Sequence, residues 1–115
     1  MIQLEHDLES FRRLESGWHF GEGDPISDSL IDRVKAFHAS LPEDYAVESF
    51  PLPKGGVQLE YWNGDTEIEI EFFENKINVY HFDSEEKVQL ELAIEDATET
   101  QARVQIKKIH EQTDE

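Results

Sequence analysis

Hydrophobic residues recur every three or four positions in the first third of the chain, which is the spacing of one helix face. This pattern predicts an amphipathic helix over residues 2–14 and a second helix that Pro42 ends. The second helix is capped either by Asp24, with Pro25 in the first helical position, or by Ser27. Its expected apolar face consists of Ile26, Leu30, Ile31, Val34, Phe37 and Leu41.

From residue 46 onward, hydrophobic and polar residues alternate, as in strands with one buried face. Asn63-Gly64 predicts a tight hairpin within this region. A short edge strand is expected at residues 47–50, because Pro51 and Pro53 prevent longer pairing. The alternation itself predicts strands over residues 57–62, 66–73, 77–81 and 88–94.

The segment after residue 96 fits two patterns. Ala102, Ile106 and Ile109 have helical spacing, whereas Ala102, Val104 and Ile106 alternate as in a strand. Its content of Gln, Arg, Lys and Ala favours the helix, with residues 111–115 frayed.

These elements predict one α+β domain over residues 1–115. It comprises a helical part (1–42), an antiparallel meander of about four strands (46–95) and a C-terminal segment (96–115). The two N-terminal helices are expected to cover the apolar sheet face, formed by Val57, Leu59, Tyr61, Ile68, Ile70, Phe72, Ile77 and Val79.

Residues 17–25 form a loop, since three glycines and a proline exclude a regular element. Trp18 and Phe20 are expected to pin this loop to the body of the domain, with Trp18 buried. Glu22 and Asp24 stand where a phosphate would arrive, and the loop lacks a Lys-Ser/Thr ending, so nucleotide binding is not expected. Trp18, Glu22 and Asp24 remain candidates for contacts with a partner.

Charge restricts the partners. The chain has 27 Asp and Glu against 10 Lys and Arg, a formal net charge of −17. Such a surface repels phosphate backbones and anionic lipid, so direct binding to nucleic acid or membranes is not expected. A basic protein surface is the expected partner, and charge that only maintains solubility is the alternative.

The remaining composition indicates a folded cytoplasmic domain. Aromatic residues make up 10% of the chain, which argues against disorder. No apolar run approaches the roughly 20 residues that span a bilayer, and the first residues lack the features of a signal peptide.

The sequence contains little that indicates catalysis. There are no cysteines, the five histidines lack metal-ligand spacing, and no nucleophile motif occurs. The histidines are expected to be structural or surface groups. We therefore expect no enzyme activity, no cofactor and no metal site, although an unrecognised hydrolase stays open as an alternative.

The most informative pattern is a row of carboxylates in the meander. No Lys or Arg occurs between Gly55 and Asn75. The alternation places Glu67, Glu69 and Glu71 on one strand face, with Glu60 beside them on the neighbouring strand. The row can resemble a polyanion to a basic groove, or it can be a solvated face that deters sheet stacking.

Aromatic residues accompany this row. Trp62, Phe73, Tyr80 and Phe82 are expected on the same outer face. Aromatic residues flanked by carboxylates are typical of protein interfaces. The alternative is that the C-terminal segment crosses the sheet and buries them.

Two motifs resemble those of a family of small bacterial proteins without an assigned activity. These are Gly17-Trp18-x-x-Gly21-x-Gly23-x-Pro25 and, after a proline-rich strand, Gly55-Gly56-Val57-Gln58-Leu59-Glu60-Tyr61. The resemblance covers about residues 8 to 82. The chain departs from the family pattern at His19, where Asp is common, and at Tyr61, where Trp is common. The resemblance implies a bacterial or phage origin and a mobile-element or defence context, but no catalytic residues.

The sequence therefore predicts an acidic interaction protein that occupies a basic surface of another protein. This covers an antitoxin or immunity protein, opposed to a nuclease toxin, and an inhibitor that mimics nucleic acid to block a nucleic-acid-binding effector. A small regulatory or housekeeping domain with incidental charge is the alternative, and a homodimer stays open. The expected contact residues are Glu60, Trp62, Glu67, Glu69, Glu71 and Phe73, together with those of the loop.

Overall fold

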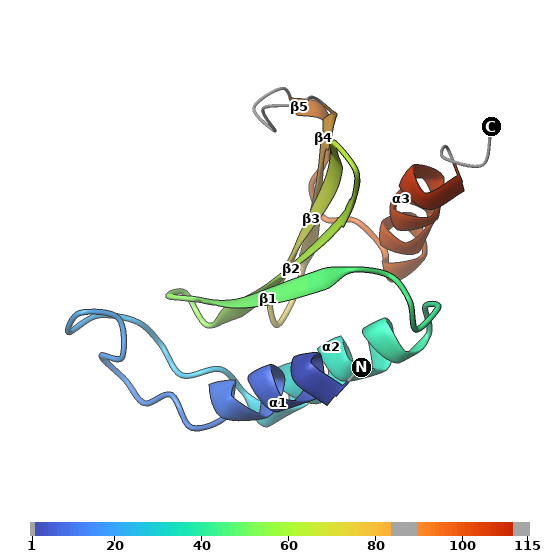
Figure 1. Cartoon of the computed structure of the whole chain (residues 1–115). Helices are drawn as coiled ribbons and strands as arrows, with labels where there is room; N and C mark the ends of the chain where they lie inside the picture. Colours follow the sequence, from blue (N-terminus) through green and yellow to red (C-terminus); the bar gives the residue numbers. More distant parts are fainter. Residues whose placement is uncertain (1, 84–89, 112–115) are drawn as a thin grey trace.

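A computed structural model of the chain describes residues 2–83 and 90–111, which form three helices and five strands (Figure 1). In chain order the elements are α1 (Ile2–Phe11), α2 (Asp28–Ala39), β1 (Val47–Leu52), β2 (Gly56–Asn63), β3 (Thr66–Phe72), β4 (Ile77–Asp83), β5 (Leu90–Ile94) and α3 (Glu99–Glu111). The predicted α+β fold is confirmed. None of the helices in these residues has the length and apolar content needed to cross a membrane.

The two N-terminal helices form where the apolar spacing places them. α1 buries Leu4, Leu8 and Phe11, and it ends at Phe11 rather than at residue 14. Ser27, and not Asp24, caps α2, because its hydroxyl oxygen accepts a hydrogen bond from Leu30 N at 3.2 Å.

Ion pairs join these two helices. Arg12, just beyond α1, contacts Asp28 at 3.1 Å and also pairs with Asp32 of α2. Lys35 of α2 reaches back to Glu9 of α1 at 2.6 Å. Their carboxylates are largely exposed, so these pairs orient the helices more than they stabilise them.

The strands form one antiparallel sheet in the order β1-β2-β3-β4-β5, each beside its neighbour in sequence. The Asn63-Gly64 hairpin is confirmed: Asn63 pairs with Thr66, and Gly64 adopts a left-handed φ of 62°. β1 is longer than predicted and pairs with β2 as far as Leu52. Pro51 is tolerated because β1 is an edge strand with a neighbour on one side only. Of the strand predicted over 88–94, residues 88 and 89 lie outside the described residues.

The last element is a helix, as its composition favours. Thr98 and Gln101 cap α3 reciprocally, each side chain accepting a hydrogen bond from the other's backbone N–H at 3.0 and 2.8 Å. Val104, which a strand would have buried, is 44% exposed. The buried helical face contains Ala102, Ile106 and Ile109. Glu111, which was predicted to be frayed, is the last residue of α3, and residues 112–115 lie outside the described residues.

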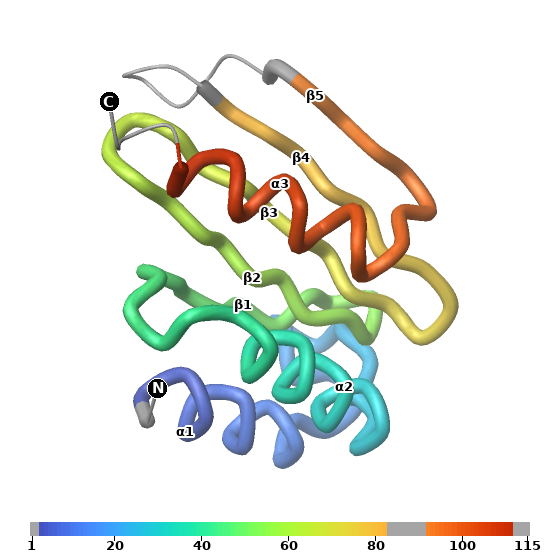
Figure 2. Tube along the Cα trace, turned by 90° about the vertical axis from the view of Figure 1, so that its right-hand side faces the viewer, coloured from blue at the N-terminus to red at the C-terminus, as the bar shows by residue number. Residues whose placement is uncertain are grey.

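All three helices lie on one side of the sheet. α1 and α2 cover the part near β1 and β2, whereas α3 lies across β2, β3 and β4 (Figures 1 and 2). The eight residues predicted for the inner sheet face are all buried and belong to one core with the helix residues. Consequently, no helix of the described residues covers the opposite face, which we call the outer face.

Candidate functional site

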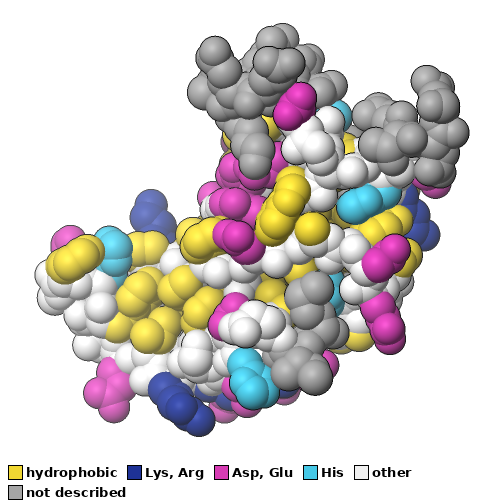
Figure 3. Space-filling view, viewed as in Figure 1, with side chains coloured by type: hydrophobic (Ala, Val, Ile, Leu, Met, Phe, Trp, Pro, Cys, Tyr) yellow, Lys and Arg dark blue, Asp and Glu magenta, His cyan; other side chains and the backbone are white. Residues whose placement is uncertain are grey.

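The outer face carries a row of acidic residues across three strands. The register places Glu48 of β1 opposite Glu60 of β2, and Glu60 opposite Glu69 of β3. Glu67 and Glu71 flank Glu69 on β3. We call Glu48, Glu60, Glu67, Glu69 and Glu71 the acidic strip. Figure 3 shows a group of acidic side chains beside hydrophobic ones, on the side of the upper strands that faces away from α3.

The predicted aromatic residues lie on this face. Trp62 and Phe82 are the cross-strand neighbours of Glu67, and Tyr80 is that of Glu69. All three are half-buried, and α3 does not cover them because it packs against the inner face. The alternative that the C-terminal segment crosses this face is therefore wrong for α3.

Glu67 is more buried than an outer-face carboxylate is expected to be. Only 8% of its surface is exposed, because Trp62 and Phe82 stand on either side of it. A carboxylate that loses water must gain other polar contacts. Glu67 shares a side-chain hydrogen bond with Glu69.

This crowding changes the ionisation of the strip. Burial, the hydrogen bond with Glu67 and the nearby charges, among them Glu60, raise the pKa of Glu69 to about 8. The raised pKa favours the protonated form of Glu69 at neutral pH. The strip carries fewer charges than the sequence alone suggests.

Polar side chains from β2 and β4 also support the strip. Gln58 Nε2 donates to Glu60 at 2.7 Å and lies 3.5 Å from Glu69. Asn78 Nδ2 and the Tyr80 hydroxyl donate to the same oxygen of Glu71, at 3.1 and 3.4 Å. These donors hold the carboxylates in place before any partner binds.

Three of the carboxylates lie close enough together to share one cation. Oxygens of Glu60, Glu67 and Glu69 are within 4.8 Å of one another, and among the described residues they form the group that could hold a metal. Hard cations such as Ca²⁺ or Mg²⁺ suit oxygen ligands of this kind. The proton of Glu69 relieves the same repulsion without a metal.

The loop over residues 17–25 is folded mainly on itself. Trp18 Nε1 donates to the Asp24 carbonyl at 2.8 Å, and the backbone N–H of Gly17 donates to Gly23 O at 2.9 Å. A Cβ on Gly23 would lie 3.0 Å from Trp18 Nε1, so glycine is required for this contact. Trp18 is half-buried, not buried as predicted, because its ring braces the loop rather than the core.

The second aromatic residue of the loop contradicts the prediction fully. Phe20 is 95% exposed and adopts a left-handed φ of 53°. It lies at the tip of a tight turn, in which His19 N donates to Glu22 O at 2.6 Å and Glu22 N to His19 O at 2.9 Å. Nothing in the pattern of the sequence distinguishes its exposure from the partial burial of Trp18.

Phe73 contributes to an apolar groove at the end of the outer face. The groove has a volume of about 530 Å³ and is lined by Leu52, Pro53, Lys54, Glu71, Phe73 and Lys76. Phe73 packs against Gly56, where a Cβ would lie 2.6 Å from the ring. The loop touches this region, since Asp24 N donates to Pro53 O at 2.7 Å. The structure thus brings Asp24 of the loop to the groove that Pro53 and Phe73 line.

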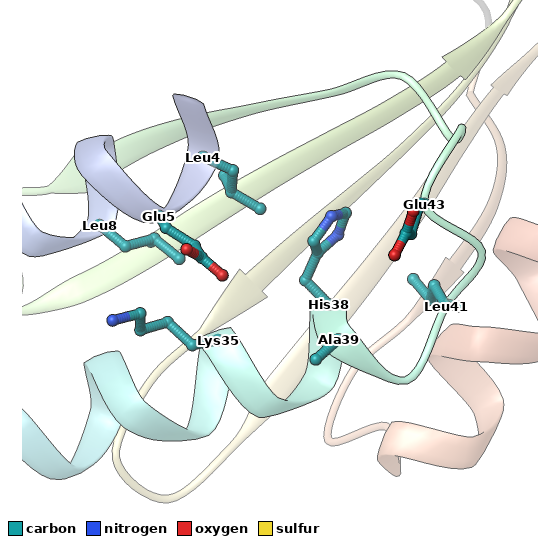
Figure 4. Close-up of a pocket in the computed structure, with 8 residues that line it drawn as sticks. All are labelled: Leu4, Glu5, Leu8, Lys35, His38, Ala39, Leu41 and Glu43. Atoms are coloured by element: carbon teal, nitrogen blue, oxygen red, sulfur yellow. The ribbon is translucent and has the colours of Figure 1, made fainter. Parts of the chain in front are cut away.

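A second cavity, of about 180 Å³, lies between α1 and α2 (Figure 4). His38 points into it, and its Nδ1 lies 2.7 Å from the buried Tyr61 hydroxyl. Burial lowers the pKa of His38 and raises that of Tyr61. The pair is a satisfied core contact, in keeping with the expectation that the histidines are structural. The alternation that places Tyr61 inward could have indicated that its hydroxyl needs a buried partner.

Neither a protein-family model, nor a curated protein, nor a solved structure matches this chain. The resemblance to the family of small bacterial proteins stays a prediction.

Proposed function

We propose that the protein is an acidic interaction module whose outer sheet face binds a basic surface of another protein. The observation that carries this proposal is a sheet face that no helix of the described residues covers and that combines the acidic strip with half-buried aromatic residues. Carboxylates held by neutral donors beside aromatic rings suit a partner that presents guanidinium groups, which pair with carboxylates and stack on rings.

Two kinds of protein need such a surface. One is an antitoxin or immunity protein that covers the basic active site of a nuclease toxin. The other is an inhibitor that mimics nucleic acid. Carboxylates two residues apart on a strand are about 6.6–6.8 Å apart. Successive phosphates rise by about 3.4 Å along the axis of one DNA strand, and their separation through space is larger than this rise. A row of carboxylates at this spacing suits either kind of protein.

The test compares two variants of equal charge. In the face variant, Gln replaces Glu48, Glu60 and Glu71. In the control variant, Gln replaces the exposed Glu5, Glu43 and Glu111. Each changes the formal charge from −17 by +3 to −14.

The probe is a nona-arginine peptide, titrated at 50 mM NaCl and followed by NMR chemical shifts. We expect the shifts of the parent to map to β2, β3 and β4, and the face variant to bind at least tenfold more weakly. The control variant should stay within about twofold of the parent. Equal weakening of both variants would refute a specific face, because net charge alone would then explain binding.

A further inference from the structure

A second surface of the molecule is formed by the loop over residues 17–25 and the apolar groove beside it. We infer that in a homodimer the loop of each copy docks into the groove of the other, with Phe20 as the anchor. This inference goes beyond the proposed function, because it concerns a second copy of the chain and does not require the acidic strip to bind a partner.

The loop is built to present an aromatic side chain. Phe20 is 95% exposed, although a phenylalanine ring is costly to leave in water. Its left-handed backbone is held by the backbone hydrogen bonds of the turn and by the Trp18–Asp24 contact. Conformations of this type persist where the surrounding structure imposes them, and they concentrate at functional sites. Because the loop is ordered in advance, docking it costs little conformational entropy.

The groove offers apolar walls and enough space for an aromatic side chain. Leu52, Pro53 and Phe73 supply apolar walls, and the volume of about 530 Å³ is sufficient for a phenyl ring. The side chain of Lys76 lies with its Nζ 5.7 Å from the centroid of the Phe73 ring. Lys54 is the second lysine of the lining.

The loop carries two carboxylates, whereas the groove lining carries two lysines and the Glu71 carboxylate, which accepts hydrogen bonds from Asn78 and Tyr80. Glu22 and Asp24 follow Phe20 closely and are exposed, and no Lys or Arg occurs from residue 14 to residue 32. Lys54 and Lys76 are exposed at the groove. A pair of lysines beside an apolar groove is unusual in a chain of charge −17, and it offers partners to the loop carboxylates of another copy.

The relative position of the two features suits two-fold symmetry. Asp24 N donates to Pro53 O at 2.7 Å, and Gly55 lies beside Pro25, so the loop and the groove adjoin within one chain. Figure 3 shows hydrophobic side chains gathered toward the end of the molecule where the loop lies in Figure 1. A two-fold axis between adjoining complementary features brings each loop onto the other copy's groove, which closes the assembly as a dimer.

The expected affinity is modest. Two phenylalanine side chains bury on the order of 300–500 Å² between them, against about 1,200 Å² or more for a typical stable interface. Each copy also repels the other through its net charge. We expect a dissociation constant on the order of 100 µM in 0.5 M NaCl, and weaker association at low salt because the overall repulsion is then unscreened.

The experiment is sedimentation equilibrium of the full chain from 10 to 500 µM, in 0.05 and 0.5 M NaCl. We expect Phe20→Ser to weaken dimerisation at least tenfold. Val104→Ser removes a hydrophobic side chain that is 44% exposed on α3, away from the groove, and should leave the dissociation constant unchanged. Since both side chains are exposed, the NMR spectra of both variants should show the parent fold.

Charge reversal provides an independent test. Glu22→Lys lowers the net negative charge and would by itself favour association, yet we expect it to weaken the dimer. Lys54→Glu should do the same, and the double variant should recover most of the affinity. A parent that is monomeric at 500 µM in 0.5 M NaCl would overturn the inference, as would a Phe20→Ser variant that associates like the parent. Salt should weaken the binding of a basic partner, whereas it should strengthen dimerisation. The proposed function and the proposed dimer can therefore be refuted independently.

Discussion

The proton on Glu69 makes the stability of the domain depend on pH in a way that one substitution tests. The folded state raises the pKa of this carboxyl from its ordinary value of 4.5 to about 8. Between these values the folded state binds a proton that the unfolded state releases. The stabilisation linked to that proton is fully present below pH 4.5 and is lost as the pH rises through 8. Glu69→Gln replaces the carboxyl with a neutral group of the same shape.

The size of the effect follows from the pKa. At about 1.36 kcal/mol for each pH unit, the difference between 4.5 and 8 sets an upper bound of roughly 5 kcal/mol. Glu69 is only half-buried, so water screens much of this energy. We therefore expect Glu69→Gln to raise the free energy of unfolding by about 1–2 kcal/mol at pH 9 and to leave it nearly unchanged at pH 5. The corresponding rise in melting temperature at pH 9 is about 4–8 °C.

Urea unfolding, followed by circular dichroism at pH 5, 7 and 9, measures this difference. Glu48→Gln is the matched control, because it makes the same substitution at an exposed position of the acidic strip. It should change the free energy of unfolding by less than about 0.5 kcal/mol at each pH. If Glu69→Gln has the same effect at pH 5 as at pH 9, or destabilises the domain at pH 9, Glu69 does not hold the proton and the account of the strip is wrong.

Three further predictions concern the helices and the loop. Trp18→Ala should lower the free energy of unfolding by about 1–2 kcal/mol, because it removes one hydrogen bond and a half-buried ring. Urea unfolding measures this loss. A loss above about 3 kcal/mol would indicate that Trp18 is buried. Ile106→Ala should lower the free energy of unfolding by about 2–5 kcal/mol in the same assay, because the Ile106 side chain is fully buried on the inner side of α3. An unchanged free energy of unfolding would mean that α3 does not pack against the sheet. Because burial lowers the pKa of His38, the unfolded state takes up a proton before the folded state as the pH falls. In the Glu69→Gln variant, the free energy of unfolding should therefore decrease as the pH falls below about 6.5. The decrease should be smaller when His38→Gln is added. Equal dependence of the two variants on pH would contradict this assignment.

Local patterns in the sequence determined most of the secondary structure. The period of three to four residues located α1 and α2, and the alternation with Asn63-Gly64 located the central hairpin, because each pattern needs only near neighbours to be expressed. Two signals were weaker. Residues 102–109 fit both a helix and a strand, and only the packing of the folded chain, which leaves Val104 exposed, distinguishes the helix from the strand. Pro51 predicted a short strand, but β1 is an edge strand, so the backbone N–H that proline lacks is not needed for pairing with a second neighbour.

The properties of the candidate surfaces depended on contacts between distant residues. The alternation placed the carboxylates on one face, but the register of three strands set Glu69 beside Glu60 and set Glu67 between two aromatic rings. That crowding raises the pKa of Glu69, which no local pattern encodes. Likewise, Trp18 and Phe20 are both aromatic residues of one glycine-rich loop, and only the folded turn directs one inward and the other into solvent. The sequence alone determined which residues share a face, because backbone geometry fixes that period. Tertiary structure decided which of them lose contact with water, because burial depends on what packs alongside.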